Sequence, residues 1–269
     1  MNIVCVGDCG IDHYVLADER RVGGITTNFA LQARRCFAHD DRLQVIAPLG
    51  NDAAAELVRN RFAGNDIECR FTVMSGNTPV QSIEIDSRGE RQFTAYDAGV
   101  LEQFRIKGED AAYIRCADLV VSPVFEQNRK MFSSLMAVER QGMTAIDFSD
   151  FAQHADFALL NKYIGQIDVG FFGLHAGHTE IMESLRLIAD TERILIVVTL
   201  GEHGSKAYHN GSVFERIAQP VQNVVDTTGA GDAFAAGFLS NYCRSSDIDA
   251  ALSTGAALAA SVVQKYGAI

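Results

Sequence analysis

Hydrophobic residues occur along this chain of 269 residues as short uninterrupted runs that alternate with longer amphipathic stretches. Strands that are apolar on both faces and separated by helices are typical of a parallel sheet covered on both sides. The short runs predict strands at 2–6, 43–48, 118–121, 143–147, 167–172 and 194–199, and the stretches between them predict helices at 28–37, 52–63, 128–140, 152–163 and 178–189. The pattern therefore indicates an α/β fold with a mostly parallel central sheet.

Two segments depart from this rhythm. Residues 79–97 alternate between apolar and polar positions around a turn, which predicts a hairpin with one solvated face. Together with 12–17 and 68–73, this hairpin is expected to build a small accessory sheet. Within 205–216, the dipeptide Asn210-Gly211 is a strong signal for a second hairpin, expected at an edge of the large sheet.

Composition narrows the class of protein. The chain is 48% hydrophobic and 21% charged, which suits one sizeable core, and no run of about 18 apolar residues predicts a membrane span. Residues 1–7 resemble a buried strand more than a signal peptide, so we expect a cytoplasmic protein. The net charge of −11 argues against a nucleic-acid surface. The six cysteines lack zinc spacing and are expected to be reduced.

The segment Asp226-Thr227-Thr228-Gly229-Ala230-Gly231-Asp232-Ala233-Phe234 carries most of the candidate chemistry. Its small residues let backbone amides approach a ligand closely. The apolar run after them predicts a buried helix, whose N-terminus offers free donors and a partial positive charge to a phosphate. Asp232 lies in the first turn, where a carboxylate stays ionised and can take a proton from an attacking hydroxyl. The alternative is a helix-capping carboxylate in an ordinary glycine-containing loop.

This segment resembles the signature of the PfkB family of carbohydrate kinases, which have the ribokinase fold. Gly23-Gly24-Ile25-Thr26-Thr27-Asn28-Phe29-Ala30 resembles a second family feature, and the elements between the two motifs occur in a fitting order. The segments 144–150, 198–205 and 265–269 are most similar to fructoselysine 6-kinases within that family. The resemblance implies one ribokinase-like domain over 1–269, built as a three-layer sandwich with a small β-sheet lid. The lid segments are expected at about 12–24 and 68–98, and a homodimer is expected to form through the lid.

The resemblance also assigns roles. The implied reaction transfers the γ-phosphoryl group of ATP to a sugar hydroxyl, which requires positioning and charge neutralisation. Asp232 resembles the catalytic base, and three residues resemble the anion hole: Gly229, Ala230 and Gly231. The implied sugar-binding residues are Asp12, Gly23, Gly24 and Asn28. The implied nucleotide-binding residues are Thr199, Gly201, Gly204 and Thr228. The alternative for Gly23 and Gly24, and for Gly201 and Gly204, is that they form simple turns. The alternative for Asn28 is a helix cap.

Cation sites are less fully specified. By resemblance, Asp226 helps a monovalent ion such as K⁺ or a divalent ion, or orders the anion-hole loop; the alternative is a turn cap. Family members usually carry an Asn-x-x-Glu motif whose Glu helps to place Mg²⁺ through water. The corresponding region, 171–180, has no Asn three residues before a Glu, which leaves Glu180 as a candidate from a shifted position. ATP brings its own Mg²⁺ in either case.

The acceptor is expected to be a small sugar or sugar-amine. Acidic residues dominate the lid hairpin, although Arg88 and Arg91 lie in or beside its turn: the acidic ones are Glu84, Asp86, Glu90 and Asp97. Such a lid tolerates an ammonium group, which favours a fructosamine such as fructoselysine, phosphorylated at its 6-position. The alternatives are another sugar or a nucleoside (fructose, ribose), or a non-catalytic ligand-binding regulator on the same fold. An NAD-dependent oxidoreductase does not fit, because Gly7-Asp8-Cys9-Gly10-Ile11-Asp12 is not a Gly-x-Gly-x-x-Gly sequence.

Overall fold

The computed structural model describes residues 1–86, 91–153 and 155–268. Its centre is a nine-stranded sheet in the order β13-β12-β11-β10-β9-β8-β1-β4-β5. The strands from β11 to β5 are parallel, and at the other edge β12 pairs antiparallel with both β11 and β13. The strands are β1 Asn2–Val6, β4 Arg42–Leu49, β5 Glu68–Val73, β8 Leu119–Pro123, β9 Met143–Asp147, β10 Val169–Gly173, β11 Leu195–Thr199, β12 Ser205–His209 and β13 Ser212–Arg216.

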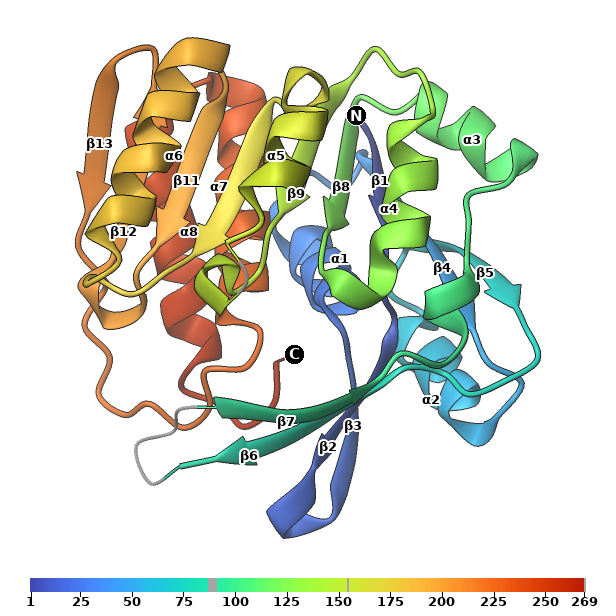
Figure 1. Cartoon of the computed structure of the whole chain (residues 1–269). Helices are drawn as coiled ribbons and strands as arrows, with labels where there is room; N and C mark the ends of the chain where they lie inside the picture. Colours follow the sequence, from blue (N-terminus) through green and yellow to red (C-terminus); the bar gives the residue numbers. More distant parts are fainter. Residues whose placement is uncertain (87–90, 154, 269) are drawn as a thin grey trace.

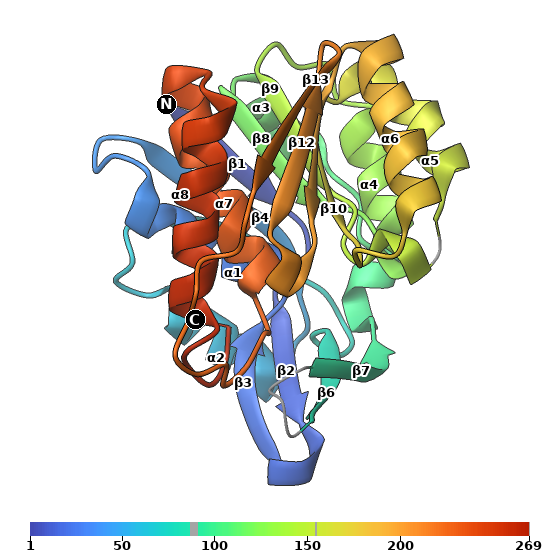
Figure 2. The ribbon, with the colours of Figure 1, turned by 90° about the vertical axis from the view of Figure 1, so that its left-hand side faces the viewer.

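Helices cover both faces of this sheet, so the fold is the expected three-layer sandwich (Figure 2). Alternate residues of β1 show the division: Ile3 and Cys5 belong to one core cluster, and Val4 and Val6 belong to another. One layer contains α1 Ile25–Cys36, α2 Ala53–Phe62, α7 Ala230–Ser245 and α8 Ile248–Val262. The other contains α3 Gly108–Arg115, α4 Arg129–Met136, α5 Phe157–Tyr163 and α6 Thr179–Glu192.

Helices α7 and α8 approach closely because both carry glycine at their contact. A Cβ at Gly237 would lie 2.9 Å from the Thr254 carbonyl oxygen, and one at Gly255 would lie 2.8 Å from that of Phe234. The stretch of small residues in α8 therefore serves tight helix packing. Among the described residues, no helix is long and apolar enough to cross a membrane.

A second sheet of four strands lies below the carboxyl ends of the large sheet, at the place where the lid is expected, and is hereafter called the lid (Figure 1). Its order is β3-β2-β6-β7, with β2 Gly10–Tyr14, β3 Glu19–Gly23, β6 Val80–Ile85 and β7 Arg91–Asp97. The expectation that 68–73 joins this lid is wrong. That segment is β5, which pairs in parallel with β4 after the crossover through α2 and so forms the edge of the large sheet.

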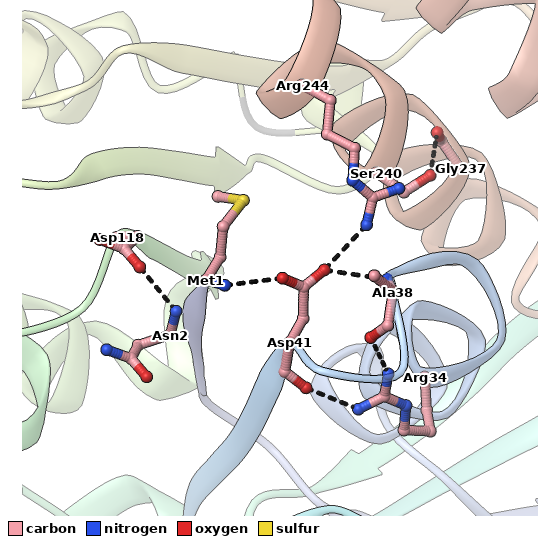
Figure 3. A network of polar contacts seen from close by, with 9 residues as sticks. All are labelled: Met1, Asn2, Arg34, Ala38, Asp41, Asp118, Gly237, Ser240 and Arg244. Atoms are coloured by element: carbon pink, nitrogen blue, oxygen red, sulfur yellow. Dashed lines mark hydrogen bonds and ion pairs between the residues drawn. The ribbon is translucent and has the colours of Figure 1, made fainter.

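A network of polar contacts stabilises the end of the large sheet that lies away from the lid, where β1 and β4 begin (Figure 3). The Asp41 carboxylate is 7% exposed and accepts hydrogen bonds from the Met1 amino group at 2.7 Å and from Arg244 at 2.8 Å. It also accepts from the Ala38 amide at 2.9 Å. Burial opposes ionisation, but these donors outweigh it and lower the pKa of Asp41. One carboxylate thus joins β1, the α1–β4 connection and the end of α7.

Candidate active site

The start of α7 presents backbone amides at the lid end of the sheet. Gly229 has a φ of 77°, and its carbonyl accepts from the Ala233 amide at 2.9 Å, which begins the helix. The Ala230 amide donates to the Thr227 carbonyl at 3.2 Å. In the described part of the chain, no protein acceptor is recorded for the amides of Gly229 and Gly231. The predicted anion hole therefore depends on these two amides more than on that of Ala230.

The two glycines differ in the space around them. A Cβ at Gly229 would lie 2.5 Å from the Ala268 Cβ, so both this contact and the positive φ require glycine. A Cβ at Gly231 would meet no atom within 4 Å. The side of α7 at Gly231 is therefore open, and a ligand there can approach the backbone.

Asp232 lies beside this opening and is 9% exposed. Its Oδ2 accepts a hydrogen bond from the Nδ2 of Asn28 at 2.8 Å. Asn28 is itself buried, and among the described residues its Oδ1 has no hydrogen-bond partner. The structure thus brings together the predicted base and a predicted sugar-binding residue that is 204 positions away.

The side chain that caps α1 is Asp8, not Asn28. The Asp8 carboxylate accepts from the amides of Ile25 at 3.1 Å and Thr26 at 3.3 Å. It is 5% exposed, and this burial raises its pKa, although the amide hydrogen bonds act in the opposite direction. The Asn28 amide group is consequently available for Asp232.

Gly23 and Gly24 make room for carboxylates. A Cβ at Gly23 would lie 2.1 Å from Oδ2 of Asp12, and one at Gly24 would lie 2.9 Å from Oδ2 of Asp8. Gly24 also has a φ of 97°, which disfavours other residues. The Cβ positions of both glycines border the side chains of Asp8 and Asp12, and their sugar-binding role stays a prediction.

Asp226 is completely buried, and its oxygens are engaged by this chain's own donors. Oδ1 accepts from the Thr228 amide at 2.8 Å, and Oδ2 accepts from the Tyr14 hydroxyl at 2.8 Å and the Gly267 amide at 2.9 Å. A carboxylate holding three donors fits the role of ordering the anion-hole loop better than that of a cation ligand. The requirement for K⁺ stays a prediction.

Glu180 is exposed in the first turn of α6. Among the described residues, no hydrogen bond joins its carboxylate to another candidate residue, and no group of three His, Cys, Asp or Glu side chains could hold a metal ion. Mg²⁺ commonly keeps several waters and binds through substrate phosphates with one or two carboxylates. The site therefore fits an ion delivered with the nucleotide.

The predicted nucleotide loop forms a closed turn between β11 and β12. The Leu200 amide donates to the Gly204 carbonyl at 2.8 Å, and the Gly204 amide donates to the Gly201 carbonyl at 3.1 Å. A Cβ at Gly204 would lie 2.0 Å from the Arg216 carbonyl, so this glycine is required by the hairpin itself. Gly201 has open space around it, and Thr199 is half-buried at the end of β11.

Sequence reasoning missed one polar group of the lid. The Tyr96 hydroxyl of β7 is buried, and within the described ranges it has no hydrogen-bond partner. Burial raises the pKa of Tyr96 well above its usual value, and the nearby carboxylates of Asp8 and Asp12 add to this. The alternation of 91–97 marks a strand, but it does not show that this hydroxyl reaches the acidic site. Arg88 and Glu90, predicted at the lid turn, lie outside the described residues.

Comparisons with known proteins show which family and fold this chain resembles. Fructoselysine 6-kinase of Escherichia coli K12 is 28% identical over 268 residues, which cover 99% of this chain and 98% of the relative. Fructosamine kinase FrlD of Bacillus subtilis 168 is 26% identical over 275 residues, covering 100% and 93%. The solved structure of Arabidopsis thaliana ribokinase, complexed with ribose and ATP, matches with a TM-score of 0.79 at 19% identity, covering 99% and 93%.

These matches confirm the ribokinase-like fold. The family model described as pfkB family carbohydrate kinase matches residues 1–269. The use of ATP and Mg²⁺ follows from that family. The chain belongs to the pfkB family of carbohydrate kinases.

Proposed function

We propose that this kinase transfers the γ-phosphoryl group of ATP to a fructosamine such as fructoselysine and forms the 6-phosphate. The observation that carries the proposal is the juxtaposition of Asp232, oriented by Asn28, with the Gly231 amide at the start of α7, for which the described residues supply no acceptor. A base and an anion-binding amide within one helical turn suit transfer to a hydroxyl. The two fructosamine-kinase relatives, which match over nearly their full lengths, support the choice of acceptor.

In this proposal Asp232 accepts the proton of the attacking hydroxyl. Asn28 orients this carboxylate through its hydrogen bond to Oδ2. The Gly229 and Gly231 amides stabilise the charge on the transferring phosphoryl group. Mg²⁺, when bound with ATP, neutralises phosphate charge.

The acidic surroundings of Tyr96 support an acceptor that carries an amine. Asp8, Asp12 and Asp97 all contribute to the electrostatic environment of its hydroxyl. A positively charged ammonium group lowers the cost of burying carboxylates, whereas a phosphorylated acceptor raises it. We also propose that two copies associate through the lid, whose connection between β2 and β3 exposes Leu16 by 80%.

A coupled assay of ADP release tests the proposal. The acceptor panel contains fructoselysine, other Amadori amines, fructose, ribose and a nucleoside, and phosphorus NMR identifies the phosphorylated hydroxyl. Preference for the fructosamines by kcat/KM, with a 6-phosphate product, supports the proposal. Preference for plain fructose, ribose or the nucleoside overturns the acceptor assignment. Ligand binding without ADP release by any acceptor would favour the regulator instead.

A further inference from the structure

The first lid strand inserts a tyrosine side chain beneath the phosphate-binding loop. Tyr14, at the end of β2, is 2% exposed, and its hydroxyl donates to Oδ2 of Asp226 at 2.8 Å. The acceptor carboxylate is completely buried. A buried hydrogen bond to an ionised group is stronger than one between neutral groups, and the loss of its donor leaves the charge poorly solvated.

Through Asp226, three distant segments meet at one carboxylate. Its Oδ1 fixes the Thr228 amide, directly before the anion-hole glycines. Its Oδ2 holds both the Tyr14 hydroxyl of the lid and the Gly267 amide of the C-terminal segment. The conformation of the loop before α7 therefore depends on a group that the lid supplies.

The C-terminal segment turns at the lid end of the molecule after α8 and then runs back toward the large sheet (Figures 1 and 2). Its residues contact both the lid and the loop before α7. Arg21 of β3 donates to the Tyr266 carbonyl at 2.8 Å, and its guanidinium lies 4.5 Å from the centre of the Tyr266 ring. The Tyr14 and Tyr266 rings are 4.7 Å apart. On the other side, Ala268 lies against the position that a Cβ of Gly229 would take.

Tyr14 shares its strand with the predicted acceptor-binding carboxylate. Asp12 and Tyr14 are two residues apart in β2, so their side chains leave the same face of the lid sheet. Any shift of β2 that accompanies acceptor binding at Asp12 also moves the hydroxyl that holds Asp226. The acceptor site and the phosphate site are thereby connected through one short strand.

We propose that Tyr14 is a positioning residue that couples the lid to the phosphate-binding amides through Asp226, with residues 265–268 as the strap between them. The proposal rests on the proposed kinase function. An acceptor bound under the lid holds β2 in position, and Tyr14 of β2 then holds the Asp226 carboxylate through its hydroxyl. Asp226 in turn positions the Thr228 amide and the amides that follow. The loop is then correctly arranged when the acceptor is in place.

The test compares Tyr14→Phe with Tyr163→Phe. Tyr163, at the end of α5 in the other helical layer, is a matched control. It is also buried, and its hydroxyl contacts Ser133 Oγ at 3.3 Å. We expect Tyr14→Phe to lower kcat by about tenfold, equivalent to about 1.4 kcal/mol of barrier, while the acceptor KM changes by less than about twofold. Tyr163→Phe should leave kcat unchanged.

Amide hydrogen exchange supplies a readout that a merely structural role would not change. In the wild type, acceptor binding should increase protection of the Thr228 and Gly267 amides, both of which donate to Asp226. In Tyr14→Phe this increase should be lost, while protection in the core strands stays the same. Wild-type kcat in Tyr14→Phe, or an unchanged response at both amides, overturns the coupling.

The two proposals fail in different ways. If the wild type releases no ADP with any acceptor, the proposed function fails, yet exchange with bound fructoselysine still tests the coupling. If the wild type is active and Tyr14→Phe behaves like Tyr163→Phe, only the coupling fails.

Discussion

Replacing Gly231 with alanine should separate catalysis from folding. The added Cβ would have no atom within 4 Å, the φ of this residue is not positive, and the position lies in the first turn of α7. Alanine is favoured over glycine in a helix by about 0.5–1 kcal/mol, so the variant should be at least as stable as the wild type. The methyl group, however, would occupy part of the open space beside the Gly231 backbone, where we propose that the phosphate binds.

The expected activity follows from the loss of one anion-hole donor, which typically costs about 10²- to 10³-fold in kcat, or about 3–4 kcal/mol. The assay measures ADP release at saturating ATP and acceptor, with thermal unfolding recorded on the same preparations. Gly229→Ala is the contrasting variant, because its φ of 77° and the 2.5 Å approach to Ala268 should lower both stability and activity. Wild-type kcat in a stable Gly231→Ala protein would refute the assignment of this amide to the phosphate.

The remaining predictions concern three carboxylates. Asp232→Asn should fold normally, because Asn28 still meets a polar partner, but lose about 10²- to 10⁴-fold in kcat, measured in the ADP assay; retained turnover would exclude it as the base. Glu180→Gln should change the Mg²⁺ dependence of kcat by less than about threefold, since the ion is held mainly by phosphates and water; a large rise in the Mg²⁺ requirement would contradict this. Asp41→Asn should lower the free energy of unfolding at pH 7 by about 2 kcal/mol. Because the folded pKa of Asp41 is lowered, its contribution is present above the unfolded pKa of about 3.9 and is lost as pH falls through the folded pKa. The pKa of the Met1 amine is raised, chiefly by its bond to Asp41, so that contribution is present below its unfolded pKa and is lost as pH rises through the folded one. Thermal unfolding of both proteins from pH 2 to 10 checks these signs, and a Tm difference that persists unchanged at pH 2 would contradict them.

Local sequence patterns were sufficient for most of the parallel strands of the large sheet, but not for its edge strand β5. The predicted strands at 2–6 and 143–147 match β1 and β9 residue for residue, because runs that are buried on both faces are unambiguous. The strand at 68–73 was predicted in the wrong sheet, since its residues alternate like a lid strand. Its partner was determined by the crossover from β4 through α2, and that choice depends on tertiary packing rather than on propensity.

The candidate site was predicted in part. The glycines and Asp232 were recognisable because short-range geometry at a helix start requires particular residue types. The partner of each side chain was not recognisable, as for the Asn28–Asp232 bond and the capping of α1 by Asp8. Hydrogen bonds between residues 17 or 204 positions apart leave no local pattern. The direction of a side chain such as Tyr96 depends on the register of the lid.

Glycine is required in the two motifs for different physical reasons, and this difference bears on acceptor specificity. Gly23 and Gly24 border the carboxylates of Asp12 and Asp8, whereas Gly231 borders open space. Adding a methyl group at Gly23 would displace Asp12 and so should alter acceptor recognition, while the same change at Gly231 should alter phosphoryl transfer to every acceptor. In the proposed function, the first motif therefore positions carboxylates for the sugar and the second positions amides for the phosphate. In this arrangement, the acceptor preference can change through the lid and the first motif without loss of the transfer chemistry.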